Sequence, residues 1–392
     1  MGLKSPMPAA GASRECYSQW LRAMMKRSEE KGGDVKYLFS SSVEEPAELL
    51  YKIIAEAFSG EVTDRYVSTF VQHGNPYFLE QIAERYGVKT DNVLSTTGAI
   101  SALSLLCRTF LLAGDHVLVE NPGFDLFCDI ATDQKAVVDF FDREGGPFTI
   151  DPGKLESKIR SDTKFVILSN LHNPSGMMLD KAVLEQLAGI AEKHKLMFIF
   201  DEVYAGYAGA DKWPGPACWF SPYFISVGSL TKIYGLSGLK CGWIVANEEI
   251  VGAVRAYSLQ FEFGVSKLTH AVGALLLEQQ DTFDDFWQSA LARSRPVLER
   301  HYAALLEEGL VSGELPEFGC ILFPKLTGIS GTLAFGEWLF EKHHIVVVPG
   351  ELFGLAGHVR IGWALPPEEL DSVFIRLRMA LREYRREELG AR

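Results

Sequence analysis

Short apolar runs alternate with amphipathic stretches through the middle of this 392-residue chain, and this alternation restricts the possible folds more than any other feature. Runs such as KFVILSN and LMFIFDE are apolar at nearly every position, as expected of strands covered on both faces. Between them, LDKAVLEQLAGIAEKHK has apolar residues three or four positions apart, as in a helix with one buried face. Strand–helix alternation of this kind predicts an α/β fold with a mostly parallel, doubly wound sheet. The predicted strands are residues 116–120, 136–141, 164–170, 196–201, 224–230 and 241–247.

The C-terminal third has a different pattern, in which the strand-like segments GCILFPKL, IVVVPG and HVRIGWAL lie among helical stretches. This pattern predicts a smaller α+β domain. No linker rich in Pro, Gly or Ser separates the two regions, so we expect them to pack closely. The expected division is an N-terminal arm belonging to the small domain (1–45), a large domain (46–275) and the C-terminal small domain (276–392).

Charge and cysteine content argue against several classes of function. A formal net charge of −13 and a pI near 5.3 disfavour nucleic acid or an anionic membrane as the partner, so any bound anion needs a local site. The six cysteines show no CxxC spacing, and we expect neither a disulfide framework nor a metal site. The N-terminus lacks the apolar core of a signal peptide, and no apolar run approaches the roughly 20 residues that span a bilayer. A cytoplasmic location is the expectation.

Polar side chains follow three of the predicted strands, where ligands of parallel sheets bind. Lys232 ends the segment Ser229-Leu230-Thr231-Lys232 and precedes the glycine-rich IYGLSGLKCGW. A lone lysine after a strand is usually a surface charge. Here the glycines permit close backbone approach, and Ser229 and Lys240 offer a hydroxyl and a cation to a phosphate. A buried lysine near other positive charge loses basicity, which favours Schiff-base chemistry.

Asp201 directly follows LMFIF, where a buried carboxylate needs a cationic partner. It is either a helix cap or the partner of a protonated pyridine nitrogen, which would keep that ring an electron sink. Tyr204, three residues later, would reach a phenolic oxygen of the same ring. Asn173 lies in HNPSG, which alone is typical of a turn, but its place at a strand end would let it donate a hydrogen bond into the same crevice.

Three further residues complete the candidate site. Gly98 lies between a short strand and the helix ISALSLLCRTFLL, where free backbone N–H groups would cradle a phosphate. Phe124 is either a core residue or an aromatic ring that stacks on a ligand. Arg360 stands in an apolar stretch and is either part of a structural salt bridge or a clamp for a substrate carboxylate.

Taken in order, these motifs resemble the class I/II aminotransferases of pyridoxal phosphate (PLP) fold type I, which are similar to aspartate aminotransferase. The family pattern is a glycine at a helix start, an aromatic stacker, Asn-Pro-(Thr/Ser)-Gly, Asp-x-x-Tyr, Ser-x-x-Lys, a basic residue eight positions on and a late arginine. The stretches GNPYFLEQIAERYGV and VVVPGELFG also resemble the family, and the resemblance covers residues 66–365. The matching residues are Gly98, Phe124, 173–176, Asp201, Tyr204, Ser229, Lys232, Lys240 and Arg360.

The resemblance implies an aminotransferase that moves an amino group between an amino acid and a 2-oxo acid through a Schiff base of PLP on Lys232. Lys232 would also move the proton between the substrate Cα and the cofactor. Asp201 would pair with the pyridine nitrogen, and Asn173 and Tyr204 would bind the phenolic oxygen. The resemblance also implies a homodimer. Of the other residues, Phe124 would stack on the ring, Gly98, Ala99, Ile100, Ser229 and Lys240 would hold the phosphate, and Arg360, Asn173 and Ser40 would bind the substrate.

Three departures from the family pattern leave alternatives open. Lys240 replaces the usual arginine, so a point charge stands in place of a bidentate fork. The loop LFSSS (38–42) replaces a glycine-containing substrate loop. No tyrosine stands at Thr69 or Phe70 to reach a neighbouring subunit's phosphate, and Tyr66 is the candidate substitute. Since one fold hosts several reactions, a lyase, cyclase, decarboxylase or oxidase is the alternative, followed by a non-catalytic effector-binding protein. Arg65 and Arg255 are candidates for a second carboxylate-binding arginine.

Overall fold

The computed structural model describes residues 16–390, apart from 33, 61, 71–73, 210 and 263. An eight-stranded sheet forms the large part of the fold. All six strands predicted from the apolar runs are present, together with a short strand before Gly98. In chain order the strands of this sheet are β2 (Val93–Thr96), β3 (His116–Asn121), β4 (Val137–Glu144), β5 (Thr149–Ile150), β6 (Thr163–Ser169), β7 (Met197–Asp201), β8 (Phe224–Ser229) and β9 (Gly242–Val245).

The sheet is mostly parallel, as the strand–helix alternation predicts. Its order is β2-β9-β8-β7-β6-β3-β4-β5, and the five strands from β8 to β4 run parallel to one another. Only β9 and β5 are antiparallel to their neighbours. The non-consecutive order requires crossover connections, so the carboxyl ends of β6, β7 and β8 meet at one edge although their residues are far apart in sequence.

Helices cover both faces of this sheet, which confirms the predicted fold class. Alternate residues of one strand point to opposite faces, so Val119 packs against one layer of helices and Leu118 against the other. The first layer holds α4 (Ala99–Phe110), α5 (Leu126–Asp133) and α8 (Glu248–Phe261), and the second holds α6 (Pro152–Ser157) and α7 (Lys181–His194).

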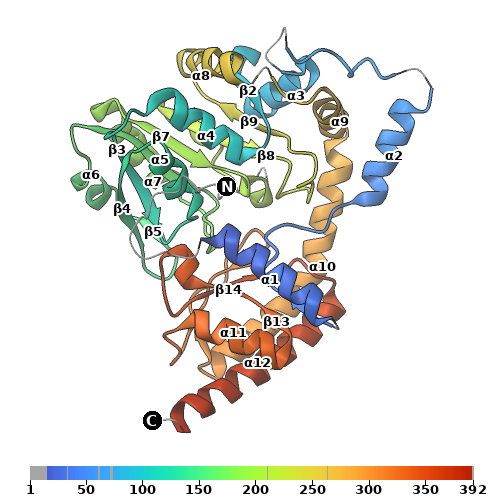
Figure 1. Ribbon diagram of the computed structural model, residues 1–392, viewed down its shortest axis with the longest axis vertical. Coiled ribbons are helices and arrows are strands. Elements are labelled where there is room, and N and C mark those ends of the chain that lie inside the picture. Colours follow the sequence, from blue (N-terminus) through green and yellow to red (C-terminus); the bar gives the residue numbers. More distant parts are fainter. Residues whose placement is uncertain are drawn as a thin grey trace, which may run out of the picture.

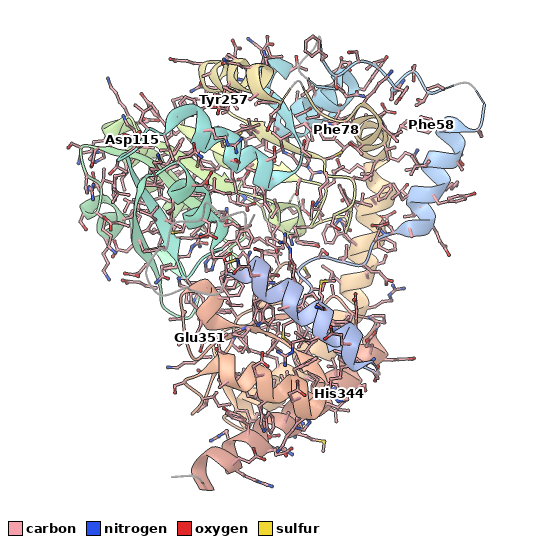
Figure 2. The ribbon with its side chains drawn as sticks, viewed as in Figure 1. Phe58, Phe78, Asp115, Tyr257, His344 and Glu351 are labelled. Atoms are coloured by element: carbon pink, nitrogen blue, oxygen red, sulfur yellow. The ribbon has the colours of Figure 1, made fainter. Side chains whose placement is uncertain are left out.

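Two helices pack together near the β2 edge of the sheet. They are α3 (Pro76–Tyr86) and α9 (Lys267–Glu278), and α2 (Ala47–Phe58) stands beside α9 at the margin of the fold (Figure 1). Phe78 of α3, labelled in Figure 2, is fully buried. Its ring lies 4.8 Å from that of His270 in α9 and 6.0 Å from that of Trp243 in β9, so it joins these helices to the sheet.

A second, smaller region is built from short strands and three helices, and we call it the small part. The long helix α10 (Gln280–Glu307) leads into it from the large sheet (Figure 1). Trp20 and Met24 of its N-terminal helix are buried against Phe340 and Val346. The small part consists of α1 (Tyr17–Lys31), β1 (Lys36–Tyr37), β10 (Val311–Ser312), β11 (Ile321–Leu322), β12 (Lys325–Leu326), α11 (Thr332–His343), β13 (Ile345–Val346), β14 (Val348–Pro349), β15 (Val359–Gly362) and α12 (Pro367–Gly390).

The strands of the small part form three small sheets, as an α+β region should. β15 lies between β11 and β14 in an antiparallel sheet, β10 pairs with β12, and β1 joins β13 in parallel. All six cysteines are free thiols. Among the described helices, none is both long and apolar enough to cross a membrane. The short 3-10 helices are η1 (Thr90–Asn92), η2 (Ala205–Ala208), η3 (Ala217–Trp219) and η4 (Gly350–Phe353).

Candidate active site

The strand register brings the predicted polar residues to one edge of the large sheet. Asp201 at the end of β7 is level with Ser169 of β6, and Ser229 at the end of β8 is level with Gly242 of β9. Gly242 is also level with Thr96 of β2. The ends of five strands therefore lie side by side and line a single crevice. Residues from the loops that follow these strands complete it.

Lys232 lies three residues beyond the end of β8, and its amine points into this crevice. The Lys232 Nζ donates a hydrogen bond to the Ser41 Oγ at 2.7 Å and lies 5.7 Å from the centre of the Tyr204 ring. Burial, and then the positive charge of Arg360, lowers the pKa of Lys232 to about 8, while Asp201 acts in the opposite direction. At neutral pH roughly a tenth of the amine is then uncharged, against about 0.03% at the ordinary lysine pKa.

Asp201 is a buried carboxylate without a cationic partner among the described residues. Its Oδ1 accepts a hydrogen bond from the Val203 backbone N–H at 3.2 Å. Burial raises the pKa of Asp201 to about 6, although the Val203 N–H and the charge of Lys232 oppose the rise. The neighbouring Tyr204 hydroxyl is also buried; Ser41 lies close enough to oppose the rise that burial causes in its pKa, but among the described residues no hydrogen bond of good geometry satisfies it. Burying a carboxylate or a hydroxyl without a suitable partner lowers the stability of the folded chain.

A backbone cradle lies where β2 leads into α4. Gly98 has a φ of 88° at the start of α4, and no side chain caps the helix. A Cβ on Gly242 would lie 2.6 Å from the Gly98 Cα and 2.9 Å from the Ala99 N, so only glycine lets β9 approach this turn. The N–H groups at the start of α4, at Ala99 and Ile100, are those that a helix does not use internally. An anion bound there would meet both these donors and the helix dipole.

The remaining predicted cofactor residues are Ser229, Lys240 and Phe124. Ser229 is buried, and its Oγ accepts a long hydrogen bond of 3.4 Å from the Thr231 N–H. Lys240 is exposed, and its charge contributes to the lowered pKa of Lys232. The Phe124 ring is half-buried and meets the Tyr17 ring edge-on at 5.9 Å.

Arg360 is almost fully buried and has no acidic partner among the described residues, which disfavours the structural salt bridge. Its Nη1 donates to the Asn173 Oδ1 at 3.0 Å, while its Nη2 donates to the Tyr17 hydroxyl at 2.8 Å and to the Phe39 carbonyl oxygen at 3.2 Å. Its Nε is buried without a partner. The guanidinium carbon lies about 5 Å from the ring centres of Tyr17 and Phe353. A buried guanidinium held by neutral groups alone is prepared to bind a carboxylate.

Asn173 is held in place by a buried polar network. The Asn173 backbone N–H donates to the Ser169 Oγ at 2.9 Å, and Ser169 in turn donates to the Glu120 carboxylate. Glu120 is paired with Arg143 at 2.7 Å, and both side chains are fully buried. This network fixes the loop that presents Asn173 to Arg360, and the sequence patterns do not reveal it.

Two residues of the site, Tyr17 and Ser41, were not predicted. Tyr17 is 343 positions from Arg360, and no periodicity links them. The serine-rich loop 38–42 was recognised, but Ser40 was the predicted substrate residue. The Ser40 hydroxyl donates to the Ser42 carbonyl oxygen at 3.2 Å, while Ser41 contacts Lys232.

The candidate second arginines are both engaged elsewhere. Arg65 pairs with Asp64 and Glu278 at 2.6 and 2.9 Å, and Arg255 lies 3.8 Å from Asp91.

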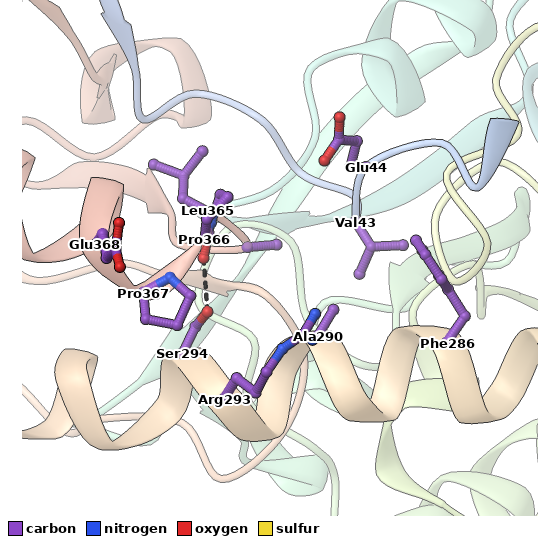
Figure 3. Close-up of a pocket in the computed structure, with 11 residues that line it drawn as sticks. Val43, Glu44, Phe286, Ala290, Arg293, Ser294, Leu365, Pro366, Pro367 and Glu368 are labelled. Atoms are coloured by element: carbon purple, nitrogen blue, oxygen red, sulfur yellow. Dashed lines mark hydrogen bonds between the residues drawn. The ribbon is translucent and has the colours of Figure 1, made fainter. Parts of the chain in front are cut away.

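Two other features of the described residues lie outside the Lys232 crevice. A cavity of about 450 Å³ is lined by Val43, Glu44, α10 and the segment after β15, and contains neither Lys232 nor Asp201 (Figure 3). Cys16, Asp125 and Asp129 have potential metal-binding atoms within 4.8 Å of one another, although the sequence predicts no metal site. The Asp125 Oδ2 already accepts a hydrogen bond from the Tyr17 N–H at 2.6 Å.

Enzymes that use PLP need an amine for the cofactor's aldehyde, a carboxylate for its ring nitrogen and an anion cradle for its phosphate. The carboxyl edge of this sheet presents all three to one crevice, so fold and site define an enzyme of that class. The family model described as aminotransferase class I and II matches residues 50–377. The chain therefore belongs to the class I and II aminotransferase family.

Three known proteins similar to this chain are two aminotransferases and one enzyme named as a synthase. An aspartate aminotransferase of Pyrococcus horikoshii is 25% identical, with 92% of this chain and 95% of the relative covered. A capreomycidine synthase of Streptomyces vinaceus is 27% identical, with 71% and 72% covered. The crystal structure of a PLP-dependent aminotransferase from Streptococcus suis is 25% identical and superposes with a TM-score of 0.82, with 93% and 97% covered.

The chain is thus a PLP-dependent transferase, which moves an amino group between an amino acid and a 2-oxo acid. The comparisons favour this reaction over the lyase, cyclase, decarboxylase and oxidase alternatives, and over a non-catalytic effector-binding protein.

The described residues fit the cofactor. The unpaired Asp201 carboxylate and the unpartnered Tyr204 hydroxyl are where a cationic ring nitrogen and a phenolic oxygen would supply the missing partners. A Cβ on Gly242 would collide with the backbone of Gly98 and Ala99, so this glycine lets the cradle keep its shape.

Proposed function

We propose that Lys232 is the residue that holds PLP and the base that moves the proton during transfer. One observation carries this proposal: the Lys232 amine shares its crevice with a buried carboxylate, Asp201, that has no cationic partner among the described residues. Because the pKa of Lys232 is lowered to about 8, enough neutral amine exists near neutral pH to react with an aldehyde or to accept a proton.

PLP supplies an electron-poor ring that accepts the electron pair left when the substrate Cα loses its proton. Asp201 would keep the ring nitrogen protonated through an ion pair. The Tyr204 hydroxyl and the Asn173 side-chain NH₂ would bind the phenolic oxygen, since the Asn173 Oδ1 already faces Arg360. Lys232 would take the proton from Cα on its Nζ and deliver it to the cofactor carbon. Phe124 would pack on the ring face.

The phosphate would be held mainly by neutral donors. The backbone N–H groups of Gly98, Ala99 and Ile100 and the Ser229 hydroxyl would form its cradle, with Lys240 as the nearby cation. In a chain with a net charge of −13, this local arrangement replaces long-range attraction.

Arg360 would bind the substrate carboxylate, with Asn173 and Ser40 completing that end of the site. The Arg360 Nε is buried without a partner and would donate to the carboxylate, while Tyr17 and Phe39, which both accept from the Nη2, hold the guanidinium in place.

Borohydride reduction followed by peptide mapping tests the role of Lys232. We expect purified protein mixed with PLP to be yellow, and reduction to fix the cofactor on Lys232. Lys232→Ala should bind PLP without a reducible bond, while Lys195→Ala, a lysine at the end of α7, serves as the control. A label on a different lysine of the wild-type chain contradicts the proposal.

We further propose that the preferred amino acid carries no second carboxylate. Of the candidate arginines for such a group, Arg65 is paired with Asp64 and Glu278, and Arg255 lies 3.8 Å from Asp91. A panel of amino acids with PLP-loaded protein, followed by absorbance and by the oxo-acid product, should show faster transfer from neutral side chains than from aspartate or glutamate. Preference for either acidic amino acid overturns this proposal.

We also propose that the enzyme is a homodimer. Tyr17 and Trp20, aromatic residues of the N-terminal segment, pack within their own chain. A different apolar surface is available around α2 and α9, where Tyr51 is 73% and Leu268 51% exposed. Other exposed apolar residues near these helices in the sequence are Ile54 of α2, Tyr66 in the loop after α2 and Phe261 at the end of α8. Tyr66, in the loop after α2, is the candidate to reach the other subunit's phosphate.

Sedimentation velocity measures the association state. The wild-type chain should sediment as a dimer, and Tyr51→Glu should shift it towards monomer with loss of activity. Met379→Glu, on the exposed face of α12, is the control, because Met379 is 59% exposed and far along the chain from α2. A fully active wild-type monomer rejects the proposal. The six free thiols, typical of a reducing compartment, favour a cytoplasmic location, which cell fractionation checks.

A further inference from the structure

Residues 38–43, which we call the strap, pass between the small part and the loop that carries Lys232. On one side the Gly362 N–H of β15 donates to the Leu38 carbonyl oxygen at 2.7 Å, and a Cβ on Gly362 would overlap the Ser40 carbonyl oxygen. On the other side, a Cβ on Gly235 would lie 2.7 Å from the Val43 carbonyl oxygen. Both crossings are too close for any residue but glycine, so the strap has a fixed position.

The strap contacts the Lys232 amine directly and reaches the Lys232 backbone through Tyr207. The Ser41 Oγ accepts the hydrogen bond from the Lys232 Nζ at 2.7 Å. The Tyr207 hydroxyl donates to the Lys232 carbonyl oxygen at 2.6 Å and accepts from the Val43 N–H at 3.4 Å. The backbone and the amine of the lysine are therefore positioned by the same six-residue segment.

Ser41 is the side chain that meets the reacting atom itself. It is buried, and Lys232 has no ion pair among the described residues that would compete for the amine. Ser41 also opposes the rise that burial causes in the pKa of Tyr204, so its hydroxyl lies close to that phenol. A rotating lysine amine can point its lone pair in several directions, and a fixed acceptor for one N–H restricts them.

We propose that Ser41 is a catalytic residue of the transfer reaction, because its hydroxyl accepts a hydrogen bond from the Lys232 amine and aims the nitrogen lone pair at the substrate Cα. This rests on the proposed role of Lys232. The proton moves from Cα to the Nζ and then from the Nζ to the cofactor carbon, and Ser41 neither gains nor loses a proton. Ser41 thus serves the step in which Lys232 is free of the cofactor.

The pKa of Lys232 responds to the groups around it, which gives the proposal a direct readout. Arg360 and Lys240 lower the pKa of Lys232, while Asp201 and Cys320 raise it, and burial outweighs all four. The Ser41 hydroxyl favours the ammonium form, because it accepts a charge-assisted hydrogen bond. Removing it should lower the pKa further. A variant that merely loosens the pocket would admit water and move the pKa up towards 10.5.

Competitive acetylation of the cofactor-free chain with acetic anhydride over pH 6–10, read out by peptide mass, measures this pKa. The wild-type midpoint for Lys232 should lie near 8. Ser41→Ala should lower it to about 7, the effect of losing one charge-assisted hydrogen bond. Ser42→Ala is the matched control next in the chain, and Ser41→Thr keeps the hydroxyl, so both should retain the wild-type midpoint.

Single-turnover kinetics of PLP-loaded protein with an amino acid deuterated at Cα test the catalytic role. Ser41→Ala should slow the half-reaction at least about tenfold and increase the isotope effect, with KM changed less than about twofold. If Ser41→Ala does not fold, Ser41→Cys replaces it, because sulfur is a weak acceptor of similar shape.

The two proposals fail in different ways. If reduced PLP maps to another lysine, the role of Lys232 is wrong. If PLP maps to Lys232 but Ser41→Ala leaves both the acetylation midpoint and the half-reaction unchanged, or moves the midpoint upwards, Ser41 has no catalytic role.

Discussion

Asp201→Asn distinguishes two effects of the buried carboxylate. It lowers the stability of the cofactor-free chain, and it strengthens the binding of PLP. Burial raises the pKa of Asp201 to about 6 from an ordinary 3.8, so the ionised form is disfavoured in the folded chain by ~3 kcal/mol. Asparagine has nearly the same shape and carries no charge. We therefore expect Asp201→Asn to be more stable than the wild type in the absence of PLP and to bind PLP more weakly.

The pH dependence of this difference follows from the direction of the shift. Below about pH 3 the carboxyl is neutral in both folded and unfolded chains, and the two proteins should be equally stable. Between about pH 3 and 6 the unfolded wild type ionises while the folded one does not, so wild-type stability falls as the pH rises. Above pH 6 the whole cost remains, and the variant keeps its advantage of ~3 kcal/mol.

Thermal melting of cofactor-free protein at pH 4 and pH 7.5 measures the difference. At pH 7.5 the variant should melt roughly 5 °C higher, and at pH 4 the difference should shrink to about 1 °C. Saturating PLP should reverse the order, because the cofactor's ring nitrogen pairs only with the carboxylate. Glu202→Gln, at the next buried carboxyl, is the control: the Glu202 Oε1 accepts from the Ala217 N–H at 2.8 Å, so the substitution should leave PLP affinity unchanged. A cofactor-free Asp201→Asn chain that melts below the wild type at pH 7.5 refutes the reasoning.

Substitutions at three further residues probe the rest of the site. Lys240→Ala should weaken PLP binding about ten- to a hundredfold by equilibrium titration, while Lys240→Arg should preserve it; unchanged affinity in the alanine variant means that Lys240 does not meet the phosphate. Tyr17→Phe removes the acceptor of the Arg360 Nη2 and should raise KM for the amino acid about tenfold with little change in kcat, whereas a pure kcat effect contradicts a binding role. Gly242→Ala should lower PLP affinity at least about tenfold, because its Cβ meets Gly98 at 2.6 Å, and wild-type affinity would show that the cradle tolerates displacement.

The large sheet was predictable from the sequence because its strands are buried on both faces. Residues of β6 such as Phe165 and Val166 pack on opposite helix layers, so nearly every position is apolar and the run stands out. Asp201 and Ser229 end such runs, and their positions at the sheet edge follow from that. The small part gave weaker signals, since strands of two residues such as β11 are too short for periodicity. Its expected boundaries, at 45 and 275, stay a prediction.

Several contacts in the site join residues that are far apart in the sequence. The hydrophobic periodicity of the sequence carries no information about such contacts. Tyr17 reaches Arg360 from a helix at the other end of the chain. Ser40, Ser41 and Ser42 are chemically identical, and only the path of the strap past Gly362 determines which hydroxyl meets Lys232. The buried Glu120–Arg143 pair was not predicted, because a charge within an apolar strand gives no hint of its partner.

The chain crosses between the large sheet and the small part twice, once through the strap and once through α10 (Figure 1). If the small part moves as a rigid body attached at these two points, its easiest movement is a hinge rotation about the line that joins them. Points near that line travel least and distant points travel most. Ser41 belongs to one of the two attachments, so its spacing from Lys232 should persist through such a rotation, while α12 at the far end of the small part would sweep the widest arc.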